Sequence, residues 1–342
     1  MAKTFLLIGA GRMGMAHLKA AQNIGLTPAA ICDMSDPNRA KAAAAAGDLP
    51  TERQYADAAT MLAAHPRADL VIIATTADSH RALVEQAAAS GAKHILCEKP
   101  MATSVADCDA MIAACEKSGT KLAINHQMRF MAQYTVVRDE LSTGNFGALA
   151  SMTATGGCYG LAMNGSHYCE AFSWLTGSPI VSATAWFSGE PFNNPRGPNF
   201  FDQAGEVRFQ SADGRRLILN IGHDQGHGMT AMYATRFGHL FVDEFEGVCY
   251  ATSRKLEHQA MPVTRYGMPW ERRELKFAQA DNVGPTEAVM RALLEGEDYP
   301  SGQDGRNVVA ALAAAYKSAA SGSCPVNVAD LGADARRQFP WA

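Results

Sequence analysis

The chain has 342 residues, and at about 100–200 residues per domain this length predicts two domains. Lys and Arg number 30 against 34 Asp and Glu, so the net charge of −4 argues against a nucleic-acid-binding protein and a polybasic membrane-surface protein. Charged residues make up 19% of the sequence, below the roughly 25% of soluble domains, which hints at oligomer interfaces unless the many alanines simply dilute the charge.

The first third of the sequence alternates between strand and helix patterns. Short apolar runs predict strands at residues 4–8, 28–32, 70–74, 94–97 and 121–124. Apolar spacing and Pro or Gly boundaries predict helices at residues 15–24, 36–46, 57–64, 79–90 and 104–118. Strands separated by helices of about 10–15 residues indicate βαβ units, so we expect a doubly wound parallel sheet.

The alternation stops near residue 125, and mostly strand patterns follow. We expect strands at residues 148–156, 180–189, 204–211, 215–221, 239–244 and 247–252. Asp213-Gly214 is a hairpin turn signal between two of them. The predicted domains are therefore residues 1–125 and residues 126–342, and the C-terminal helix is free to pack back on the first domain.

Residues 9–14 form a G-x-G-x-x-G motif that follows the first strand and opens the first helix. In that context Gly9 allows a tight turn, Gly11 lets the backbone approach a pyrophosphate, and Gly14 lets helix and strand pack closely. The N-terminus of the helix offers free N–H groups and a positive partial charge to phosphates. The motif predicts a dinucleotide site.

Asp33 stands at the end of the second predicted strand. Its carboxylate would accept hydrogen bonds from the adenosine ribose and repel a 2′-phosphate, which favours NAD over NADP. The alternative is that Asp33 begins a turn and caps the next helix. Arg12, Ser35 and Arg39 are nearby phosphate-capable groups that keep NADP open, and Met13 is included with Arg12 among the expected cofactor contacts.

Two later motifs point to a known family. The first is Cys97-Glu98-Lys99-Pro100, at the end of the strand predicted at residues 94–97. The second is the segment 74–80, which follows the strand predicted at residues 70–74 and contains Thr75 and His80. Together they closely resemble the glucose–fructose oxidoreductase, inositol dehydrogenase and MocA (Gfo/Idh/MocA) family, with its Glu-Lys-Pro signature and Thr-Pro-Asn…His loop. Thr76 and Ala77 replace the Pro and Asn of that loop.

The resemblance continues through most of the chain. Residues 125–130, ending in Arg129-Phe130, look like the family's segment that ends in Arg-Phe or Arg-Trp. Residues 165–177 resemble its Gly-x-His-x-x-Asp…Trp-Leu-x-Gly helix, with Glu170 in the Asp place, and residues 315–319 resemble another recurring stretch.

This resemblance implies an α/β protein with an N-terminal Rossmann domain and a C-terminal α/β domain built on a large, open, mostly antiparallel sheet. One face of that sheet packs on the Rossmann domain in the family, and the other commonly forms a homodimer or homotetramer. The second face would explain the low charged fraction of this sequence.

The same resemblance implies the catalytic residues. Lys99 would hydrogen-bond the reacting oxygen and stabilise the developing alkoxide. His167 would act as general base in oxidation and as acid in reduction, with a buried, satisfied helix-cap histidine as the alternative. Glu170 follows one helical turn later, either to orient His167 or as an ordinary first-turn acid. The expected cofactor-binding residues are Gly9, Gly11, Arg12, Met13, Gly14, Asp33, Thr75, His80, Glu98 and Lys99.

One member of the family's usual set is missing. Many family enzymes carry an Asp four residues before the His, and Met163 stands there in this sequence. Because a thioether cannot relay a proton, another group would have to fill the polar role, and Asn164, Tyr159 and Tyr168 are the candidates. Residues expected to contact substrate are Lys99, Arg129, Tyr159, Asn164, His167 and Tyr168.

We expect no metal site. His223 and His227 have the i, i+4 spacing of helical metal ligands, but Gly222, Gly226 and Gly228 argue against a helix there. A substrate-facing loop or a plain polar turn is the alternative for this segment.

The eight cysteines form no C-x-x-C pair, so we expect free thiols in a reducing, cytoplasmic compartment. The first residues lack the pattern of a signal peptide, and no apolar run approaches the ~18 residues of a membrane span, so no membrane partner is expected.

The leading expectation is an NAD(P)-dependent oxidoreductase that moves hydride between nicotinamide and a hydroxyl or carbonyl carbon of a sugar, inositol or related polyol. Met163 motivates two alternatives. One is an enzyme that retains its cofactor and uses transient oxidation to drive elimination or glycoside cleavage. The other is a cofactor-binding regulator without catalysis.

Overall fold

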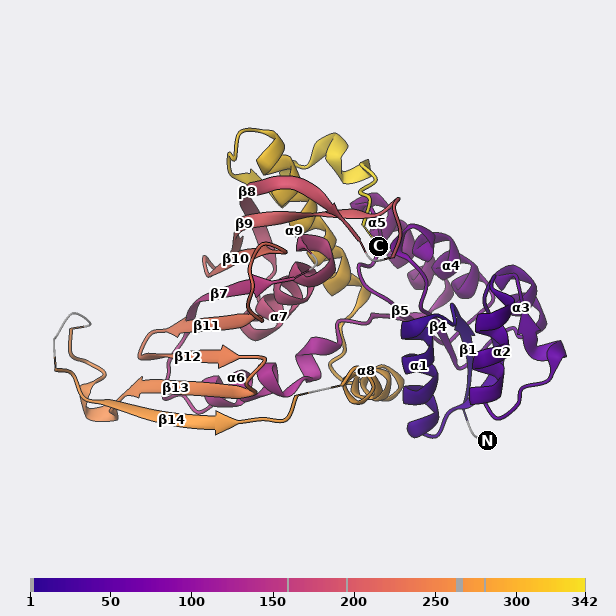
Figure 1. Cartoon of the computed structure of the whole chain (residues 1–342), viewed down its shortest axis with the longest axis horizontal. Coiled ribbons are helices and arrows are strands. Elements are labelled where there is room, and N and C mark those ends of the chain that lie inside the picture. The colour runs from indigo at the N-terminus through magenta and orange to yellow at the C-terminus, as the bar shows by residue number, and fades with distance from the viewer. Residues whose placement is uncertain (1–2, 159, 195, 263–266, 280, 342) are drawn as a thin grey trace. The chain divides into compact units, whose positions relative to one another are not determined.

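The computed structural model describes residues 3–158, 160–194, 196–262, 267–279 and 281–341. The chain divides into two compact units (Figure 1). The first unit comprises Met1–Gln127, Asp281–Val309 and Ala335–Ala342, and the second comprises Met128–Ala280 and Ala310–Asp334.

The first unit is built on a parallel sheet, which has six strands among the described residues. Its strands are β1 (Thr4–Ile8), β2 (Thr27–Cys32), β3 (Gln54–Tyr55), β4 (Leu70–Ile73), β5 (His94–Cys97) and β6 (Lys121–Ile124). Their spatial order is β3-β2-β1-β4-β5-β6, and every neighbouring pair is parallel. The strand β4 is buried along its whole length, as expected for a sheet covered on both faces.

Three of the six described helices that lie wholly in the first unit begin at a residue whose side chain caps them. The six are α1 (Arg12–Asn23), α2 (Asp36–Ala45), α3 (Ala58–Ala64), α4 (Ala77–Ala89), α5 (Val105–Ser118) and α8 (Gly284–Glu295). Ser35, Asp57 and Ser104 each accept a hydrogen bond from a backbone N–H in the first turn of α2, α3 and α5. The helix α9 (Gly302–Ala320) contributes residues to both units.

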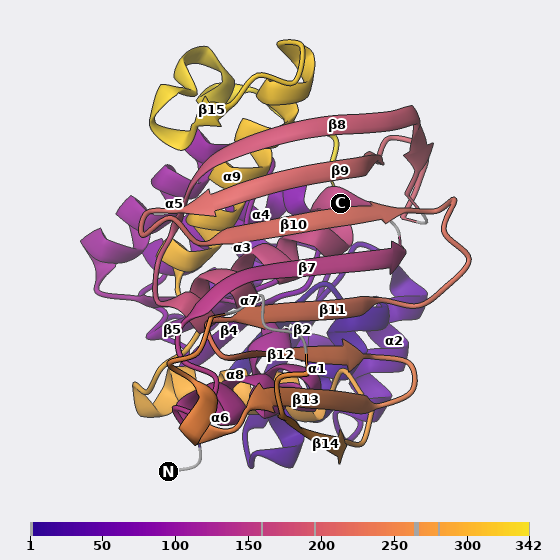
Figure 2. The same cartoon turned by 90° about the vertical axis from the view of Figure 1, so that its left-hand side faces the viewer.

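The second unit is built on a mixed sheet, which has nine strands in the described part of the chain. These are β7 (Leu149–Gly157), β8 (Ile180–Asn193), β9 (Phe201–Ser211), β10 (Arg216–Gly222), β11 (Thr230–Thr235), β12 (Gly238–Asp243), β13 (Val248–Arg254), β14 (Trp270–Lys276) and β15 (Val326–Asn327). Their order is β14-β13-β12-β11-β7-β10-β9-β8-β15 (Figure 2). The β7–β10 pair is parallel, and the other pairs given by the described strands are antiparallel.

The two faces of the mixed sheet differ. Along β10, Leu217, Leu219 and Ile221 are buried on one face, while Ile218 is 38% exposed on the other. The helices α6 (Ala132–Ser142) and α7 (Ser166–Thr176) belong to this unit as well. The exposed face keeps further apolar side chains, which include Met232, 47% exposed on β11.

The predicted fold class is confirmed, with a parallel Rossmann sheet followed by a large, mostly antiparallel one. The six strands predicted beyond residue 125 occur with end shifts of a few residues, and Gly214 forms the predicted turn between β9 and β10 at a φ of +85°. The strands β11 and β14 and the two-residue strands β3 and β15 were not expected. The β14 segment is mostly charged and almost wholly exposed, so it lacks the alternation that marks a strand.

None of the described helices has the length and apolar character needed to cross a bilayer.

Candidate functional site

Two glycines of the loop between β1 and α1 pack closely against other backbone atoms of the first unit. Gly9 has a φ of +88°, and a Cβ there would lie 2.7 Å from the carbonyl oxygen of Ala74 at the end of β4. A Cβ at Gly14 would lie 2.0 Å from the carbonyl oxygen of Gly9. These two positions therefore require glycine for packing within the polypeptide.

Gly11 differs from its two neighbours in the motif. A Cβ at Gly11 would meet no atom of the described chain within 4 Å, and its φ of −69° suits any residue. The polypeptide alone does not require glycine at this position. A group outside the chain that approaches the backbone closely would require it, and the pyrophosphate of a dinucleotide is such a group.

The start of α1 is suited to an anion. Gly11 is the N-cap residue, and among the described residues no side chain caps this helix. The first N–H groups of a helix lack partners within it and carry positive partial charge. The loop and the helix N-terminus together fit the phosphates of a dinucleotide, with Arg12 and Met13 in the first turn.

Asp33, directly after β2, lies against the same loop. Its Oδ2 accepts a hydrogen bond from the Ala10 N–H at 2.7 Å, and its Oδ1 accepts one from the Ser35 N–H at 2.8 Å. Ser35, rather than Asp33, is the N-cap of α2. Arg39 donates to the carbonyl oxygen of Asp33 at 2.5 Å and forms an ion pair with Asp36. Asp33 therefore joins the glycine-rich loop to the β2–α2 turn.

Glu98 lies at the carboxyl end of β5 and is 3% exposed. Its Oε1 is 2.7 Å from the imidazole Nε2 of His17 on α1 and accepts a hydrogen bond from the Asn125 amide at 2.9 Å. Burial would raise the pKa of the Glu98 carboxyl, but hydrogen bonding and charge from His17, with the Lys99 charge, hold that pKa well below its usual range. A buried carboxylate that is ionised at neutral pH therefore precedes Lys99 in the chain.

Lys99 is 8% exposed at the same sheet edge, and its backbone N–H donates to Glu98 Oε2 at 3.2 Å. The fully buried His80 joins this segment to the β4–α4 loop. Its ring nitrogens lie 3.1 Å from the Pro100 carbonyl oxygen and 3.3 Å from that of Thr75. The structure thus brings the loops that carry Gly9, Thr75, Glu98 and Lys99 to one edge of the parallel sheet, where open α/β sheets bind ligands.

In the second unit, Arg129 and Glu170 form a buried ion pair. The Arg129 Nε donates to Glu170 Oε1 at 2.8 Å, and the two side chains are 3% and 1% exposed. Glu170 therefore supports the guanidinium of Arg129, a role that neither sequence interpretation of Glu170 included. His167 lies in the first turn of α7, one turn before Glu170, and is 7% exposed.

Tyr168 contacts a second buried carboxyl. Its hydroxyl donates to Glu244 Oε1 at 3.0 Å, and the Tyr134 hydroxyl of α6 donates to the same atom at 3.4 Å. Burial raises the pKa of Glu244 to about 7, although hydrogen bonds from Tyr168 and Tyr134 oppose that rise. Glu244 is thus a buried carboxyl that accepts a hydrogen bond from Tyr168 and has a pKa close to neutral pH.

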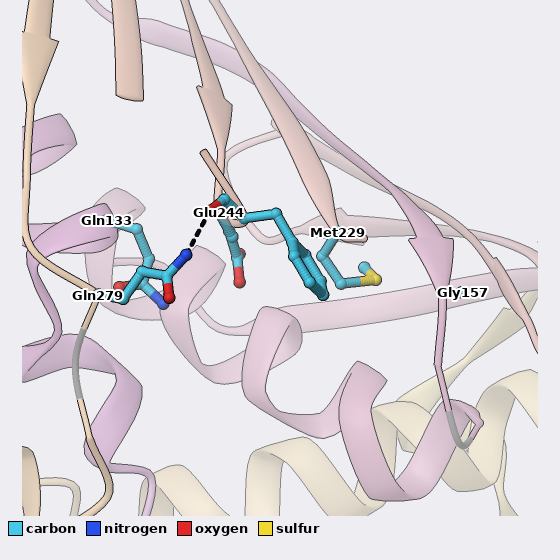
Figure 3. Close-up of a pocket in the computed structure, with 6 residues that line it drawn as sticks. Gln133, Gly157, Met229, Glu244 and Gln279 are labelled. Atoms are coloured by element: carbon cyan, nitrogen blue, oxygen red, sulfur yellow. Dashed lines mark hydrogen bonds between the residues drawn. The ribbon is translucent and has the colours of Figure 1, made fainter. Parts of the chain in front are cut away.

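Glu244 also lines a cavity of about 250 Å³ in the second unit. The other lining residues are Gln133, Gly157, Met229, Phe245 and Gln279. Figure 3 shows Gln133, Glu244 and Gln279 gathered on one side and Met229 on another, with a hydrogen bond from Gln279 to the Phe245 carbonyl oxygen. The cavity therefore combines a carboxyl and two carboxamides with apolar surface.

Met163 is held through its backbone. Its N–H donates to Asp202 Oδ2 at 2.9 Å, and the Asn194 amide lies 3.7 Å from its sulfur. Asn164 lies in the same π-helical turn, Leu161–Gly165, immediately before α7. The predicted substrate contact Tyr159 lies outside the described residues.

The predicted site residues belong to two units. Gly9, Asp33 and Lys99 are in the first unit, whereas Arg129 and His167 are in the second. Within each unit the structure gathers them at neighbouring loops and helix ends, as described above.

Sequence reasoning missed two buried carboxyls, Asp202 and Glu244. An acid at an inward-facing position of the alternating strand β9 was an available signal for Asp202. Glu244 sits between other acidic residues at the end of β12, where an ordinary solvated turn is the simpler interpretation.

The His223–His227 segment is a loop between β10 and β11 rather than a helix, as its glycines predict. No group of three or more His, Cys, Asp or Glu side chains is arranged to hold a metal ion in the described ranges.

Comparisons with known proteins place these features in a wider context. The family model GFO_IDH_MocA, described as an oxidoreductase family with an NAD-binding Rossmann fold, matches residues 3–126. The rhizopine catabolism protein MocA of Rhizobium meliloti is 32% identical over 235 residues, which cover 63% of this chain and 70% of that protein.

Higher identity is found over a shorter stretch. A D-apiose dehydrogenase of Paraburkholderia graminis is 44% identical over 142 residues, 41% of this chain. The match spans 36% of the length of that enzyme, and the match to a D-apiose dehydrogenase of Rhizobium rhizogenes spans 40%.

The fold is also that of solved structures. An oxidoreductase of Agrobacterium radiobacter, crystallised with NAD+, L-tartaric acid and magnesium, superposes with a TM-score of 0.78 at 22% identity. The superposition covers 96% of this chain and 99% of that chain, so both units are shared.

Proposed function

The chain belongs to the Gfo/Idh/MocA oxidoreductase family, and we propose that it is an NAD(P)-dependent dehydrogenase or reductase acting on CH–OH groups of a sugar, inositol or related polyol. The observation that carries the proposal is the buried Glu98–Lys99 pair at the carboxyl end of β5, at the sheet edge that also holds the glycine-rich loop. Relatives named D-apiose dehydrogenase and inositol 2-dehydrogenase support the class of substrate.

The first unit would hold the cofactor. The open position at Gly11 and the uncapped start of α1 fit a pyrophosphate, and the Asp33 carboxylate beside Ala10 fits a ribose diol. The negative charge of Asp33 favours NAD over NADP, while Arg12 and Arg39 keep NADP as the alternative. When bound, the nicotinamide ring supplies the hydride acceptor or donor.

Two side chains would handle the reacting oxygen and its proton. The Lys99 ammonium, beside the buried carboxylate of Glu98, would bind the hydroxyl oxygen and stabilise negative charge as it develops there. His167 would take the hydroxyl proton during oxidation and return it during reduction. The buried Arg129–Glu170 pair would stiffen α7 behind His167.

The cavity beside Glu244 would receive part of the substrate. A carboxyl and the carboxamides of Gln133 and Gln279 are suited to hydrogen-bonding several hydroxyl groups, and Met229 and Phe245 offer apolar surface to the carbon skeleton. A volume of about 250 Å³ suits a molecule of monosaccharide size.

The experiment incubates the purified protein with NAD or NADP and a panel of sugars and polyols, including D-apiose and myo-inositol, and follows the reduced-nicotinamide absorbance. Lys99→Met and His167→Ala should each lower turnover at least ~100-fold, as loss of an oxyanion donor or proton acceptor does, while cofactor binding persists. Lys93→Met is the matched control, because Lys93 is an exposed lysine immediately before β5.

The possible outcomes separate the three functions. Reduction of free cofactor with a member of the panel supports the dehydrogenase. Product formed without net cofactor reduction would replace it with the cofactor-retaining enzyme. Full turnover in both variants would remove the proposed catalytic roles, and cofactor binding without turnover across a broad panel would favour the regulator.

We further propose that the protein is a homodimer or homotetramer in the cytoplasm. Trp186, Ile218 and Met232 are 52%, 38% and 47% exposed on the open face of the mixed sheet, which supports burial of that face against a second copy. All eight cysteines are free thiols, which is typical of a reducing compartment.

A further inference from the structure

Asp202 is a buried carboxylate surrounded by hydrogen-bond donors. It lies near the start of β9, faces inward and is 2% exposed. Its Oδ2 accepts from the N–H groups of Ala162 at 2.8 Å and Met163 at 2.9 Å. Its Oδ1 accepts from the Gln203 N–H at 2.8 Å and from the Tyr316 hydroxyl of α9 at 3.0 Å.

Two of these donors are backbone N–H groups at the start of a helical segment. Ala162 and Met163 lie in the first part of the π-helical turn Leu161–Gly165, which continues into α7 at Ser166. The first N–H groups of such a segment have no carbonyl partners within it. The carboxylate of Asp202 therefore caps this turn from a distant strand, much as an N-cap Asp caps its own helix.

The backbone of Gly160 lies close against the Asp202 side chain. Gly160 has a φ of +112°, and a Cβ there would lie 2.5 Å from the Asp202 Cγ. Only glycine fits this contact and this dihedral angle. The ring of Tyr316 is fixed in turn by an edge-to-face contact with Phe187, with ring centroids 4.9 Å apart. The capping contact is thus supported by strands β8 and β9 and by helix α9.

We propose that Asp202, together with Tyr316, is the positioning residue of His167, because it fixes the turn from which α7 and its first-turn histidine begin. The proposal rests on the role assigned to His167 in the proposed function. Asp202 acts through the backbone of residues 162 and 163 and does not contact the reacting atoms in this role. Burial raises the pKa of Asp202 to about 6 against the pull of its hydrogen bonds, so at neutral pH it is ionised and accepts from every donor around it.

Two substitutions test the proposal at different strengths. Asp202→Asn replaces one acceptor oxygen with an NH₂ group that faces N–H donors, so at least one backbone N–H loses its partner. Tyr316→Phe keeps the ring and removes only one donor. Ser318→Ala is the matched control, because Ser318 is also buried on α9 and its hydroxyl bonds Cys324 and Ala185 but not the turn.

For each variant, kcat, KM, the cofactor dissociation constant, the melting temperature and amide hydrogen exchange of residues 160–167 are measured. Asp202→Asn should lower kcat roughly 10–100-fold through misplacement of His167, with cofactor affinity unchanged within about twofold. Tyr316→Phe should lower kcat about 3–10-fold, with a smaller effect on KM. Amide hydrogen exchange at Ala162 and Met163 should accelerate in Asp202→Asn and in Tyr316→Phe. In Ser318→Ala, neither kcat nor the exchange rate should change.

The measurements separate the possible failures. Normal kcat in folded Asp202→Asn and Tyr316→Phe overturns the proposal, whether or not amide exchange is faster. Such a result would mean that the contacts of Asp202 and Tyr316 do not position His167. If Asp202→Asn does not fold, Tyr316→Phe decides alone. A wild-type protein without dehydrogenase activity would contradict the proposed function instead. In that case, unchanged amide exchange in Asp202→Asn and Tyr316→Phe would still show that Asp202 does not stabilise the turn.

Discussion

The carboxylate of Glu98 lies 2.7 Å from the imidazole of His17, and both side chains are buried. This pair joins the strand end that carries Lys99 to the helix that begins at the glycine-rich loop. The two parts of the expected cofactor site are therefore connected through one buried hydrogen bond, and its loss should be visible in stability and in its dependence on pH.

Glu98→Gln should lower the free energy of unfolding by roughly 1–3 kcal/mol at pH 7, since it removes the charge from a buried, hydrogen-bonded carboxylate. The folded-state pKa of Glu98 lies below its unfolded value of about 4.3, so the stabilisation is present above that value and is lost as pH falls through the folded-state pKa. Urea unfolding at pH 7 and at about pH 4 should show the gap between wild type and variant narrowing in acid. An equal gap at both values would contradict the assignment.

Glu244 should give the opposite dependence on pH. Its folded-state pKa is raised to about 7, so the folded protein binds more protons than the unfolded one between about pH 4.3 and 7, and stability falls as pH rises through that range. Glu244→Gln removes the ionising group and should remove up to roughly 3 kcal/mol of this loss. Unfolding measured at pH 5.5 and 8 checks the prediction, and a variant with the wild-type pH slope would refute it.

Two glycines of the same motif should respond differently to alanine. Gly11→Ala places its Cβ in open space, so the melting temperature should stay within about 2 °C of wild type while NADH affinity falls at least ~10-fold. Gly14→Ala drives a Cβ into the Gly9 carbonyl oxygen and should destabilise the first unit whether or not cofactor is present. Thermal melts and NADH fluorescence titrations measure both effects. Wild-type affinity in Gly11→Ala would mean that the pyrophosphate does not approach there.

Asp33→Asn should shift the cofactor preference. The asparagine keeps an acceptor for the Ala10 N–H but removes the negative charge that repels a 2′-phosphate. The ratio of kcat/KM for NADP to that for NAD should rise at least ~10-fold, which corresponds to about 1.4 kcal/mol. The control is Asp48→Asn, since Asp48 is an exposed carboxylate that follows α2. An unchanged ratio in Asp33→Asn would remove Asp33 from ribose recognition.

The open face of the mixed sheet should control oligomeric state. Ile218 and Met232 both lie opposite Thr153 of β7, so they share one row across three strands. Ile218→Lys and Met232→Lys should lower the solution mass measured by light scattering, because each would place a charge within the proposed interface. Leu256→Lys, 77% exposed outside the sheet, should leave the mass unchanged. A monomeric wild type, or equal masses in all variants, would rule out this interface.

The parallel sheet could be predicted almost strand by strand, because its buried strands are continuous apolar runs separated by capped helices. The strand β3 was not predicted, because two residues are too few to show a strand pattern. The β14 strand escaped because its charged residues pair at a sheet edge, where neither face needs to be apolar.

The site was less predictable where partners lie far apart in sequence. The glycine motif and the Glu98–Lys99 segment are local patterns, so the sequence suffices to find them. Glu170 pairs with Arg129 across 41 residues, and Asp202 bonds Met163 across 39. Local spacing carries no information on such contacts, which depend on how the segment of Arg129 lies against α7 and how β9 lies against the turn before α7.

The first unit is closed by parts of the chain that follow the second unit in sequence. The Ile124 N–H of β6 donates to the Pro300 carbonyl oxygen at 2.9 Å, α8 packs against β5 and β6, and Trp341 is 1% exposed. A fragment that ends at residue 127 would lack Asp281–Val309 and Ala335–Ala342, and it would expose the apolar surface that those segments cover. Chimeras that exchange cofactor preference between relatives should therefore transplant three segments together.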